Sequence, residues 1–522
     1  MRVIITLAGH SRRFKSAGYN LPKFLIKIDG KPIVSHVVDL FDYRDNFHFV
    51  LNNKQVEEFP DLKDFLESLA KKVEVTIIKE HELGPTFSAL QVDKIMEKEE
   101  VIISYCDFKI HWDYQAFKRE VFGYEAAAPS FKGFHPASFG NTLFAYMKVN
   151  KKNEMLQLKE KESFTKKRQE EYANVGIYYF NSWSLFKKYA NKLYEEEDFS
   201  GLREGYTSLL LNPMVKDGLT VKVTDVDKFI CLGTPEDLDQ YKFWSEFFTE
   251  DSPKVPKAFP KQINLIPMAG KGSRFRLSGY QTSKPLVLVK EKPMIIQACK
   301  SFPSASKWVF LPKQEDLDKY PIKDSLKEID DKAIVIGVKK ETSGQLTTCL
   351  LAKDKIKSED PIFIASCDYI THYSFDDWKI ITEDKSIDGA IWTFKTKFIA
   401  TKEPKAFAYC QTLEDTNLVS EVVEKNTISD NPGEDPVVVG SFWFRKGEDF
   451  LWCAENSIKR DMRVKNEYFI GNSINLLLKE KKRKFVTFPI TKWISFGDPF
   501  ELKIYEYWED YYRKSREIEF NL

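Results

Sequence analysis

The sequence predicts an α/β protein of two tandem domains, each a mostly parallel, mixed sheet with helices on both faces. The first observation behind this prediction is a long internal repeat, in which residues 7–32 recur as 268–293, 261 positions later (274 − 13 = 261). A repeat of this length indicates a duplicated domain, because solenoid repeats are only about 20–50 residues long. The second observation is that each half alternates short apolar runs with helix-like stretches, as in sheets covered on both faces.

Each expected strand is a short run rich in β-branched and aromatic residues. The runs are 3–7, 47–51, 73–78 and 101–105 in the first half, and 264–267, 308–311, 333–338 and 362–366 in the second. Helix-like stretches such as 33–40 and 86–96 lie between those of the first half. Residues 249–261, with three prolines and mixed charges, predict a linker between a domain at 1–248 and a domain at 262–522. We expect each domain to fold alone, because each contains a complete set of strands.

The composition excludes several classes of partner. Lys and Arg number 79 against 78 Asp and Glu, so no net charge attracts nucleic acid or an anionic membrane. The seven cysteines include no CxxC pair, as expected in a reducing compartment. No apolar run approaches the ~20 residues of a membrane span, and no signal-peptide pattern follows Met1. We therefore expect a cytoplasmic protein without membrane insertion.

The first candidate site element is the loop after the first strand of each half. A glycine turn, an arginine and, ten residues further on (23 − 13 = 10), a lysine recur in both copies. These positions are Gly9, Ser11, Arg13 and Lys23, and Gly270, Gly272, Arg274 and Lys284. Glycine lets backbone N–H groups approach phosphate oxygens, and arginine offers a planar donor fork to phosphate. The alternatives are a plain turn, which the recurrence disfavours, and a dinucleotide-binding loop, which would have a third glycine in place of the arginine.

The second candidate element is an aspartate at the end of the fourth apolar run, Asp107 and Asp368 (368 − 107 = 261). The carboxyl edge of such a sheet is where open α/β folds bind ligands, and a carboxylate there suits Mg²⁺. The alternative is a helix cap or turn residue. His111 and His372 follow four residues later and could ligate a softer metal, but a hydrogen-bonded structural role is favoured.

Two weaker elements also recur. Lys161 and Lys425 (425 − 161 = 264) each precede a strand and could neutralise a second phosphate, although surface lysines are common. Gly84 in the first half, and Gly344 with Gln345 in the second, precede helix-like stretches. A glycine at the start of a helix there could approach a nucleobase or a phosphate.

With these motifs in order, both halves resemble the sugar-phosphate nucleotidyltransferases, also called nucleoside-diphosphate-sugar pyrophosphorylases. They are similar in particular to short members associated with bacterial capsule and surface-polysaccharide pathways, and the resemblance covers nearly all of both halves. It implies a Rossmann-like α/β domain with a smaller mixed sheet over the active site. By this resemblance Arg13, Lys23, Arg274 and Lys284 act on the triphosphate, Asp107 and Asp368 bind Mg²⁺, Lys161 and Lys425 bind the acceptor phosphate, and Gly9, Ser11, Gly84, Gly270, Gly272, Gly344 and Gln345 bind the nucleotide.

The resemblance implies a reaction between a nucleoside triphosphate (CTP, UTP or dTTP) and a phosphorylated small-molecule acceptor. A phosphate oxygen of the acceptor attacks the α-phosphorus and pyrophosphate leaves, giving an activated precursor for surface polysaccharide. A phosphate monoester is already anionic near neutral pH, so no strong general base is needed. Catalysis is then positioning and charge neutralisation by lysine, arginine and Mg²⁺.

The chain departs from the family pattern at a late Gly-Thr motif. Many members have an aspartate two residues before its glycine as a second Mg²⁺ ligand, where this chain has Cys231 and Ser495. Ser11 also replaces a loop glycine, and Asp498 replaces threonine in the second late motif. Either the metal is bound differently, through His111 and His372 or through water, or at least one copy is impaired. Three interpretations of the whole chain stay open: two active sites with different acceptors, one catalytic half beside a nucleotide-binding scaffold, or a glycosyltransferase. The last would carry an Asp-x-Asp motif, which is missing beside Asp107.

Overall fold

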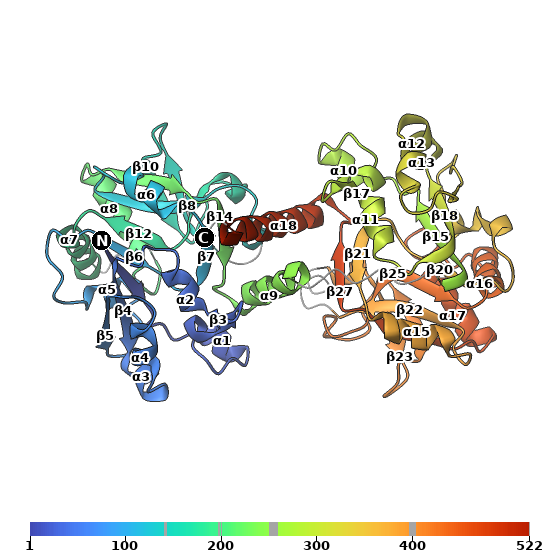
Figure 1. Ribbon diagram of the computed structural model, residues 1–522, viewed down its shortest axis with the longest axis horizontal. Helices are drawn as coiled ribbons and strands as arrows, with labels where there is room; N and C mark the ends of the chain where they lie inside the picture. Colours follow the sequence, from blue (N-terminus) through green and yellow to red (C-terminus); the bar gives the residue numbers. More distant parts are fainter. Residues whose placement is uncertain (140–142, 197–198, 200, 250–258, 396–402, 521–522) are drawn as a thin grey trace. The chain divides into compact units, whose positions relative to one another are not determined.

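The computed structural model describes residues 1–139, 143–196, 199, 201–249, 259–395 and 403–520. The chain forms two compact units (Figure 1). Unit 1 comprises Met1–Thr249 together with Tyr507–Leu522, and unit 2 comprises Glu250–Glu506. The borders expected from the proline-rich stretch stay a prediction, because most of that stretch, 250–258, lies outside the described residues.

Unit 1 is built on a mixed sheet with the strand order β10-β9-β11-β8-β12-β6-β1-β4-β5, and β13 pairs with β8. The strands are β1 Arg2–Thr6, β4 Asn46–Asn52, β5 Val73–Ile78, β6 Val101–Ser104, β8 Ala126–Phe131, β9 Ala145–Val149, β10 Met155–Glu160, β11 Tyr172–Asn174, β12 Ile177–Phe180 and β13 Val221–Asp225. Strands β6, β1, β4 and β5 run parallel, whereas β12 pairs antiparallel with β6 and continues into an antiparallel extension.

Unit 2 repeats this arrangement with the order β19-β18-β15-β20-β25-β22-β26, and β23 pairs with β24 and β25. The strands are β15 Phe259–Met268, β18 Ala305–Pro312, β19 Ile334–Val335, β20 Ile362–Ile364, β22 Gly389–Phe394, β23 Ala408–Thr412, β24 Val419–Glu424, β25 Val437–Phe444 and β26 Phe485–Pro489. β15 pairs in parallel with β18 and β20, and β20 pairs antiparallel with β25. The predicted α/β class with mixed sheets is confirmed, with parallel pairing concentrated in the first strands of each unit.

Helices surround both sheets. Those of unit 1 are α1 Arg12–Ser16, α2 Ile33–Val38, α3 Asn53–Glu58, α4 Leu62–Glu67, α5 Pro85–Leu90, α6 Tyr114–Glu120, α7 Trp183–Glu195, α8 Leu211–Lys216 and α9 Pro235–Thr249. Unit 2 has α10 Ser273–Leu277, α11 Met294–Lys300, α12 Gln314–Lys319, α13 Ile322–Leu326, α14 Gln345–Leu350, α15 Phe375–Glu383, α16 Gly447–Lys459 and α17 Ile470–Glu480, and α18 Pro499–Phe520 enters unit 1 at Tyr507. In the described part of the chain, none of these helices has the length and apolar character needed to cross a membrane.

Strand β1, an interior strand of the unit 1 sheet, has three consecutive apolar residues for a structural reason. Successive side chains of a strand point to opposite faces. Val3 and Ile5 accordingly belong to one hydrophobic cluster and Ile4 to another, and all three are fully buried. A strand covered on both faces needs a continuous apolar run rather than alternation, as expected for the middle of a sheet with helices on each side.

A short two-stranded ribbon in each unit places the candidate aspartate. In unit 1, β7 (Phe108–His111) starts directly after Asp107 and pairs antiparallel with β14 (Lys228–Cys231). In unit 2, β21 (Tyr369–His372) follows Asp368 and pairs with β27 (Lys492–Ser495). Each ribbon therefore brings the aspartate next to the late Gly-Thr motif, although more than 100 residues separate them in sequence (231 − 107 = 124).

Candidate active sites

The lysine of the first loop and the strand-end aspartate meet in both units. Lys23 Nζ lies 2.7 Å from Asp107 Oδ2, and Lys284 Nζ lies 2.6 Å from Asp368 Oδ2. Each lysine begins a 3₁₀ turn, Lys23–Leu25 or Lys284–Leu286, which follows the loop and directs the side chain towards the carboxyl edge of the sheet. The sequence placed these two residues in separate elements, and the structure joins them in one ion pair.

Further cations gather around the first of these pairs. Burial alone would raise the pKa of Asp107, but Lys23, followed by Arg13 and Lys161, holds that pKa below its usual value. The charges of all three predicted cations therefore favour the ionised form of this one carboxylate. In unit 2, burial alone would lower the pKa of Lys284, but the charge of Asp368 raises it above its usual value.

The first loop has the same backbone shape in both copies, despite Ser11. Ser11 has φ 52° and its counterpart Gly272 has φ 60°, both left-handed, directly before α1 and α10. A non-glycine residue pays about 1–2 kcal/mol there. The Ser11 hydroxyl accepts a hydrogen bond from the Lys23 backbone N–H at 3.1 Å, which partly offsets that strain. The serine therefore preserves the loop and fixes the lysine turn.

The loop is tethered in the same way in both copies. His10 Nδ1 lies 3.0 Å from Glu80 Oε1, and Lys271 Nζ lies 2.8 Å from Glu341 Oε1, at equivalent positions (341 − 80 = 261). In unit 1 this region borders an open hollow of about 480 Å³. Its lining is polar and charged: His10, Arg12, Lys15, Glu80, His81 and Glu82. Such a hollow beside a glycine loop and a strand edge has room for a polar, charged ligand.

Gly84 and Gly344 have a steric reason to be glycine. Their φ angles are 94° and 118°, and a Cβ would lie 2.7 Å from the Gly205 carbonyl oxygen or 2.6 Å from that of Tyr468. Gln345, the next residue in unit 2, donates through Nε2 to Ser366 Oγ at 3.3 Å, close to Asp368 in sequence. The predicted contact of these residues with a nucleotide stays a prediction, because packing explains both glycines.

Lys161 and Lys425, which the sequence predicts to bind the acceptor phosphate, share an unusual backbone conformation. Lys161 has φ 58° and Lys425 has φ 57°, a left-handed conformation that is rare for lysine. Each ammonium donates to a backbone carbonyl, that of Leu143 at 3.1 Å or that of Ala406. Strained residues cluster at functional sites, and the same strain recurs here at the same place in two copies.

A carboxylate precedes each of these lysines, and the sequence analysis did not predict it as a site residue. Glu160 and Glu424 precede Lys161 and Lys425, and burial raises the pKa of both, to about 7 for Glu424. Glu160 accepts a hydrogen bond from Ser208. The repeated Glu-Lys pair in the sequence was the signal that could have identified these carboxylates.

Comparison with known proteins decides the family. The nucleotidyl transferase family model matches residues 2–205 and again 263–511, most of the chain. The chain belongs to the nucleotidyl transferase family. The predicted family and enzyme class are confirmed for both halves, whereas the capsule type stays a prediction.

Individual relatives match only parts of this nucleotidyl transferase. The bifunctional protein GlmU of Methanocaldococcus jannaschii is 25% identical over 182 residues, which cover 35% of this chain and 40% of GlmU. The chain thus spans less than half the length of that relative. The inositol-1-phosphate CTP transferase from T. maritima is 18% identical with a TM-score of 0.36, covering 48% of this chain and 97% of that one. A UDP-glucose pyrophosphorylase complexed with UDP-glucose is 17% identical with a TM-score of 0.38, covering 48% and 99%.

The first of the two recurring histidines of this nucleotidyl transferase makes structural contacts. His111 stacks on Tyr511, with ring centroids 4.6 Å apart, and its Nε2 lies 3.0 Å from Ser515 Oγ. Burial lowers the pKa of His111 and of His372 to about 4. Among the described residues, no group of three or more His, Cys, Asp or Glu could by itself hold a metal ion.

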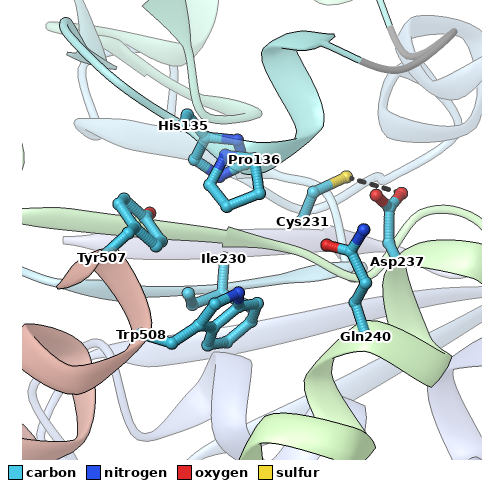
Figure 2. Close-up of a pocket in the computed structure, with 8 residues that line it drawn as sticks. All are labelled: His135, Pro136, Ile230, Cys231, Asp237, Gln240, Tyr507 and Trp508. Carbon is cyan, nitrogen blue, oxygen red and sulfur yellow. Dashed lines mark hydrogen bonds between the residues drawn. The ribbon is translucent and has the colours of Figure 1, made fainter. Parts of the chain in front are cut away.

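The late motif keeps a carboxylate, but on a helix instead of a strand end. Cys231 Sγ donates to Asp237 Oδ2 at 3.2 Å (Figure 2), and Ser495 Oγ donates to Glu501 Oε2 at 2.7 Å. Both carboxylates lie six residues after the small side chain (237 − 231 = 6). They sit in the first turn of α9 or α18, where acidic residues commonly cap a helix. The sequence analysis did not identify Asp237 or Glu501.

Proposed function

We propose that each unit is an active site that joins a nucleoside triphosphate (CTP, UTP or dTTP) to a sugar phosphate or similar phosphomonoester, with release of pyrophosphate. The product is an activated precursor for surface polysaccharide, and the two sites differ in acceptor. The observation that carries the proposal is the recurrence of one arrangement, a left-handed loop whose lysine meets a strand-end aspartate, in two copies. We place the reaction in the cytoplasm, in keeping with the free state of all seven cysteines.

The proposed chemistry needs charge neutralisation more than acid–base catalysis. An oxygen of the acceptor phosphate forms a bond to the α-phosphorus, and the bond from that phosphorus to the bridging oxygen breaks, so its electron pair leaves with pyrophosphate. Arg13 and Lys23, with Arg274 and Lys284 in unit 2, would neutralise charge on the triphosphate. Lys161 and Lys425 would hold the phosphate of the acceptor. Fixed cations stabilise a charged transition state strongly because they need no reorganisation.

The donor set fits Mg²⁺ as a partial site. Asp107 offers a hard carboxylate at the edge of the sheet. One of its oxygens already binds a cation, the Lys23 ammonium, at 2.7 Å. Mg²⁺ is often held by one or two carboxylates together with substrate phosphates and water. Asp107 and Asp368 would hold the ion, which when bound would add positive charge beside the phosphates.

Pyrophosphate release tests this proposal directly. The full chain is assayed with a panel of nucleoside triphosphates and sugar phosphates, with EDTA and then excess Mg²⁺ as additions. We expect pyrophosphate release that EDTA abolishes and excess Mg²⁺ restores. A double variant, Lys23→Ala with Lys284→Ala, is the control and should be inactive. Turnover that is independent of metal, or transfer from a nucleotide sugar without pyrophosphate chemistry, would contradict the proposal. The preserved loop at Ser11 removes one reason to regard unit 1 as a mere scaffold.

A further inference from the structure

Residues 507–516 belong to unit 1, although the sequence places them at the end of the second copy. We refer to them as the C-terminal aromatic segment. Four aromatic side chains of α18 are buried there, with 8, 3, 1 and 8% of their surfaces exposed: Tyr507, Trp508, Tyr511 and Tyr512. Their spacing places them along one face of a helix. This face packs against the rest of unit 1.

The segment contacts both strands of the ribbon that follows Asp107. Tyr511 stacks on His111 of β7 at an interplanar angle of 11°. On β14, the Tyr507 hydroxyl donates to the carbonyl oxygen of Phe229. Asp510 Oδ2 lies 2.9 Å from Lys228 Nζ, in a pair whose side chains are only 28% and 14% exposed. Stacking, a hydrogen bond and an ion pair therefore fix the segment to the ribbon at separate points.

The segment also packs along α9, which follows β14. Trp508 stacks on Trp244 with centroids 6.4 Å apart, and Tyr512 stacks on Phe248 at 5.4 Å. Each of these pairs joins a residue to its own counterpart in the other copy (508 − 244 = 264). Such pairs bury large apolar areas, and aromatic stacking adds about 0.5–1.5 kcal/mol beyond the burial.

One end of the ribbon lies next to Asp107, the candidate metal ligand of the first site. Asp107 directly precedes β7, and its carbonyl oxygen accepts a hydrogen bond from the Leu232 N–H at 2.8 Å. Cys231 ends β14 and, with Asp237, lines a cavity of about 10 Å³ whose other wall includes Tyr507 and Trp508 (Figure 2). A space this small holds at most about one water, so the packing is close and a shift of the segment reaches the ribbon.

We propose that the C-terminal aromatic segment is a positioning element of the first active site. It touches no reacting group and acts through β7 and β14, whose alignment sets the position of the Asp107 carboxylate. The first site is thus completed by residues that follow the whole second copy in sequence. The catalytic consequence rests on the proposed function, whereas the structural part does not.

The kinetic test uses the full chain with Lys284→Ala to silence the second site. Tyr511→Ala in that background is expected to lower kcat of the first site by up to about 100-fold, the scale of a 1 Å misplacement. KM for the nucleotide should change little, because the segment does not touch Arg13 or Lys23. Tyr511→Phe should restore kcat, since Phe247 occupies the equivalent position in α9. Lys503→Ala, at an exposed position of α18 before the segment, is the control and should leave kcat unchanged.

A second measurement is independent of turnover. Cys231 is partly exposed whereas the other six cysteines are buried, so thiol alkylation reports on the end of β14. Tyr507→Ala should raise the alkylation rate of Cys231 by about tenfold or more, because local opening becomes easier. Cys231→Ser gives the blank. If Tyr511→Ala does not fold, Ser515→Ala replaces it in the kinetic test with a smaller expected loss. It removes a hydroxyl that contacts His111 Nε2 and donates to the Tyr511 carbonyl oxygen within α18.

The outcomes separate the two claims. Faster labelling without any pyrophosphate chemistry would retain the structural role and reject the proposed function. Pyrophosphate release that persists at full kcat in Tyr511→Ala, with unchanged labelling in Tyr507→Ala, would overturn the positioning role. Equal losses of kcat in Tyr511→Ala and Tyr511→Phe would overturn it too, since the stack and not the hydroxyl is the proposed contact.

Discussion

Lys23 and Asp107 neutralise each other across 2.7 Å, and Lys284 and Asp368 do so across 2.6 Å. The lysine is proposed to bind phosphate and the aspartate to bind Mg²⁺, so a metal–nucleotide complex would offer each partner a new counter-ion of higher charge. The lysine–aspartate pair would be replaced by a lysine–phosphate pair and an aspartate–metal pair, so every charge that is shielded from water would keep a counter-ion. This matters because an uncompensated charge in such a place is expensive.

The two lysines give the sharpest test of which unit is active. Lys23→Ala and Lys284→Ala should each remove one activity, by about 2–4 kcal/mol of transition-state stabilisation if the ammonium meets the developing charge. The measurement is kcat/KM of each variant with each accepted sugar phosphate. If Lys23→Ala leaves every activity and nucleotide affinity intact while Lys284→Ala eliminates turnover, unit 1 is a scaffold.

Glu424 should make the stability of unit 2 fall as the pH rises. Burial raises its pKa in the folded protein to about 7, from an ordinary value near 4.5. Between these values the folded state binds more protons than the unfolded state, so the free energy of unfolding decreases with increasing pH. Glu424→Gln should therefore gain stability relative to the natural chain between pH 5 and pH 8, by about 1–3 kcal/mol.

Urea unfolding at pH 5 and pH 8 checks this expectation. Glu414→Gln, at an exposed carboxylate of the same unit, is the matched control and should show no such change. A Glu424→Gln variant whose advantage is the same at both pH values would mean that the carboxylate is ionised in the folded protein throughout.

At the scale of the elements, the two candidate glycines of unit 1 differ in the space around them. A side chain at Gly84 would clash with the backbone, whereas one at Gly9 would not. Gly84→Ala should destabilise unit 1 by about 2 kcal/mol or more, because it combines a positive φ with a backbone clash at the start of α5. Gly9→Ala should leave stability almost unchanged, because a Cβ there meets no atom within 4 Å. If the Gly9 backbone approaches a phosphate, that variant should instead lose nucleotide affinity.

Thermal melts and nucleotide titrations of the two variants separate packing from binding. The opposite pattern, a stable Gly84→Ala and an unfolded Gly9→Ala, would show that the steric argument is wrong. Equal affinity of Gly9→Ala and the natural chain would remove Gly9 from the proposed phosphate site.

Local apolar patterns predicted the bounds of several strands closely, because buried strands have continuous apolar sequences. The run 73–78 is β5, and 47–51 lies within β4. The helix expected at 86–96 ends at Leu90, and Lys94 has a left-handed backbone, φ 62°, that an α-helix does not accommodate. The ribbon of β7 and β14 was not predicted, because its two strands find each other only through pairing that is distant in sequence.

The residues of the candidate site were predictable where a local motif marks them, but the contacts between those residues were not. The repeat marked Arg13, Lys23, Asp107 and Lys161 one by one, since each belongs to a local motif. It gave no indication that Lys23 and Asp107 would pair, or that Asp237 would accept a hydrogen bond from Cys231. Those facts depend on tertiary packing, which a motif does not contain.

At the scale of the whole molecule, the C-terminal aromatic segment changes the expectation that the first domain folds alone. A chain of residues 1–249 would expose apolar surface of α9 and β14 that Tyr507, Trp508, Tyr511 and Tyr512 cover. Full burial of one such side chain is worth about 1.5–3 kcal/mol. We expect 1–249 to unfold at lower urea concentration than unit 1 of the full chain, and a peptide of residues 507–520 to raise its midpoint.

Urea titrations of 1–249 with and without that peptide provide the measurement. A peptide in which Tyr507, Trp508, Tyr511 and Tyr512 are alanine is the control and should have no effect. A 1–249 chain that unfolds at the midpoint of unit 1 in the full protein would show that the segment is dispensable for folding.

Because the segment lies at the end of the chain, it is synthesised well after the rest of unit 1. A ribosome that adds about 5–20 residues per second needs roughly 10–50 s to travel from residue 249 to residue 507. During that interval the first copy is already outside the ribosome with the apolar side of α9 uncovered. The second copy, in contrast, is made in one stretch. We therefore expect the unit that is translated first to mature last, and to depend longer on chaperones that shield apolar surface.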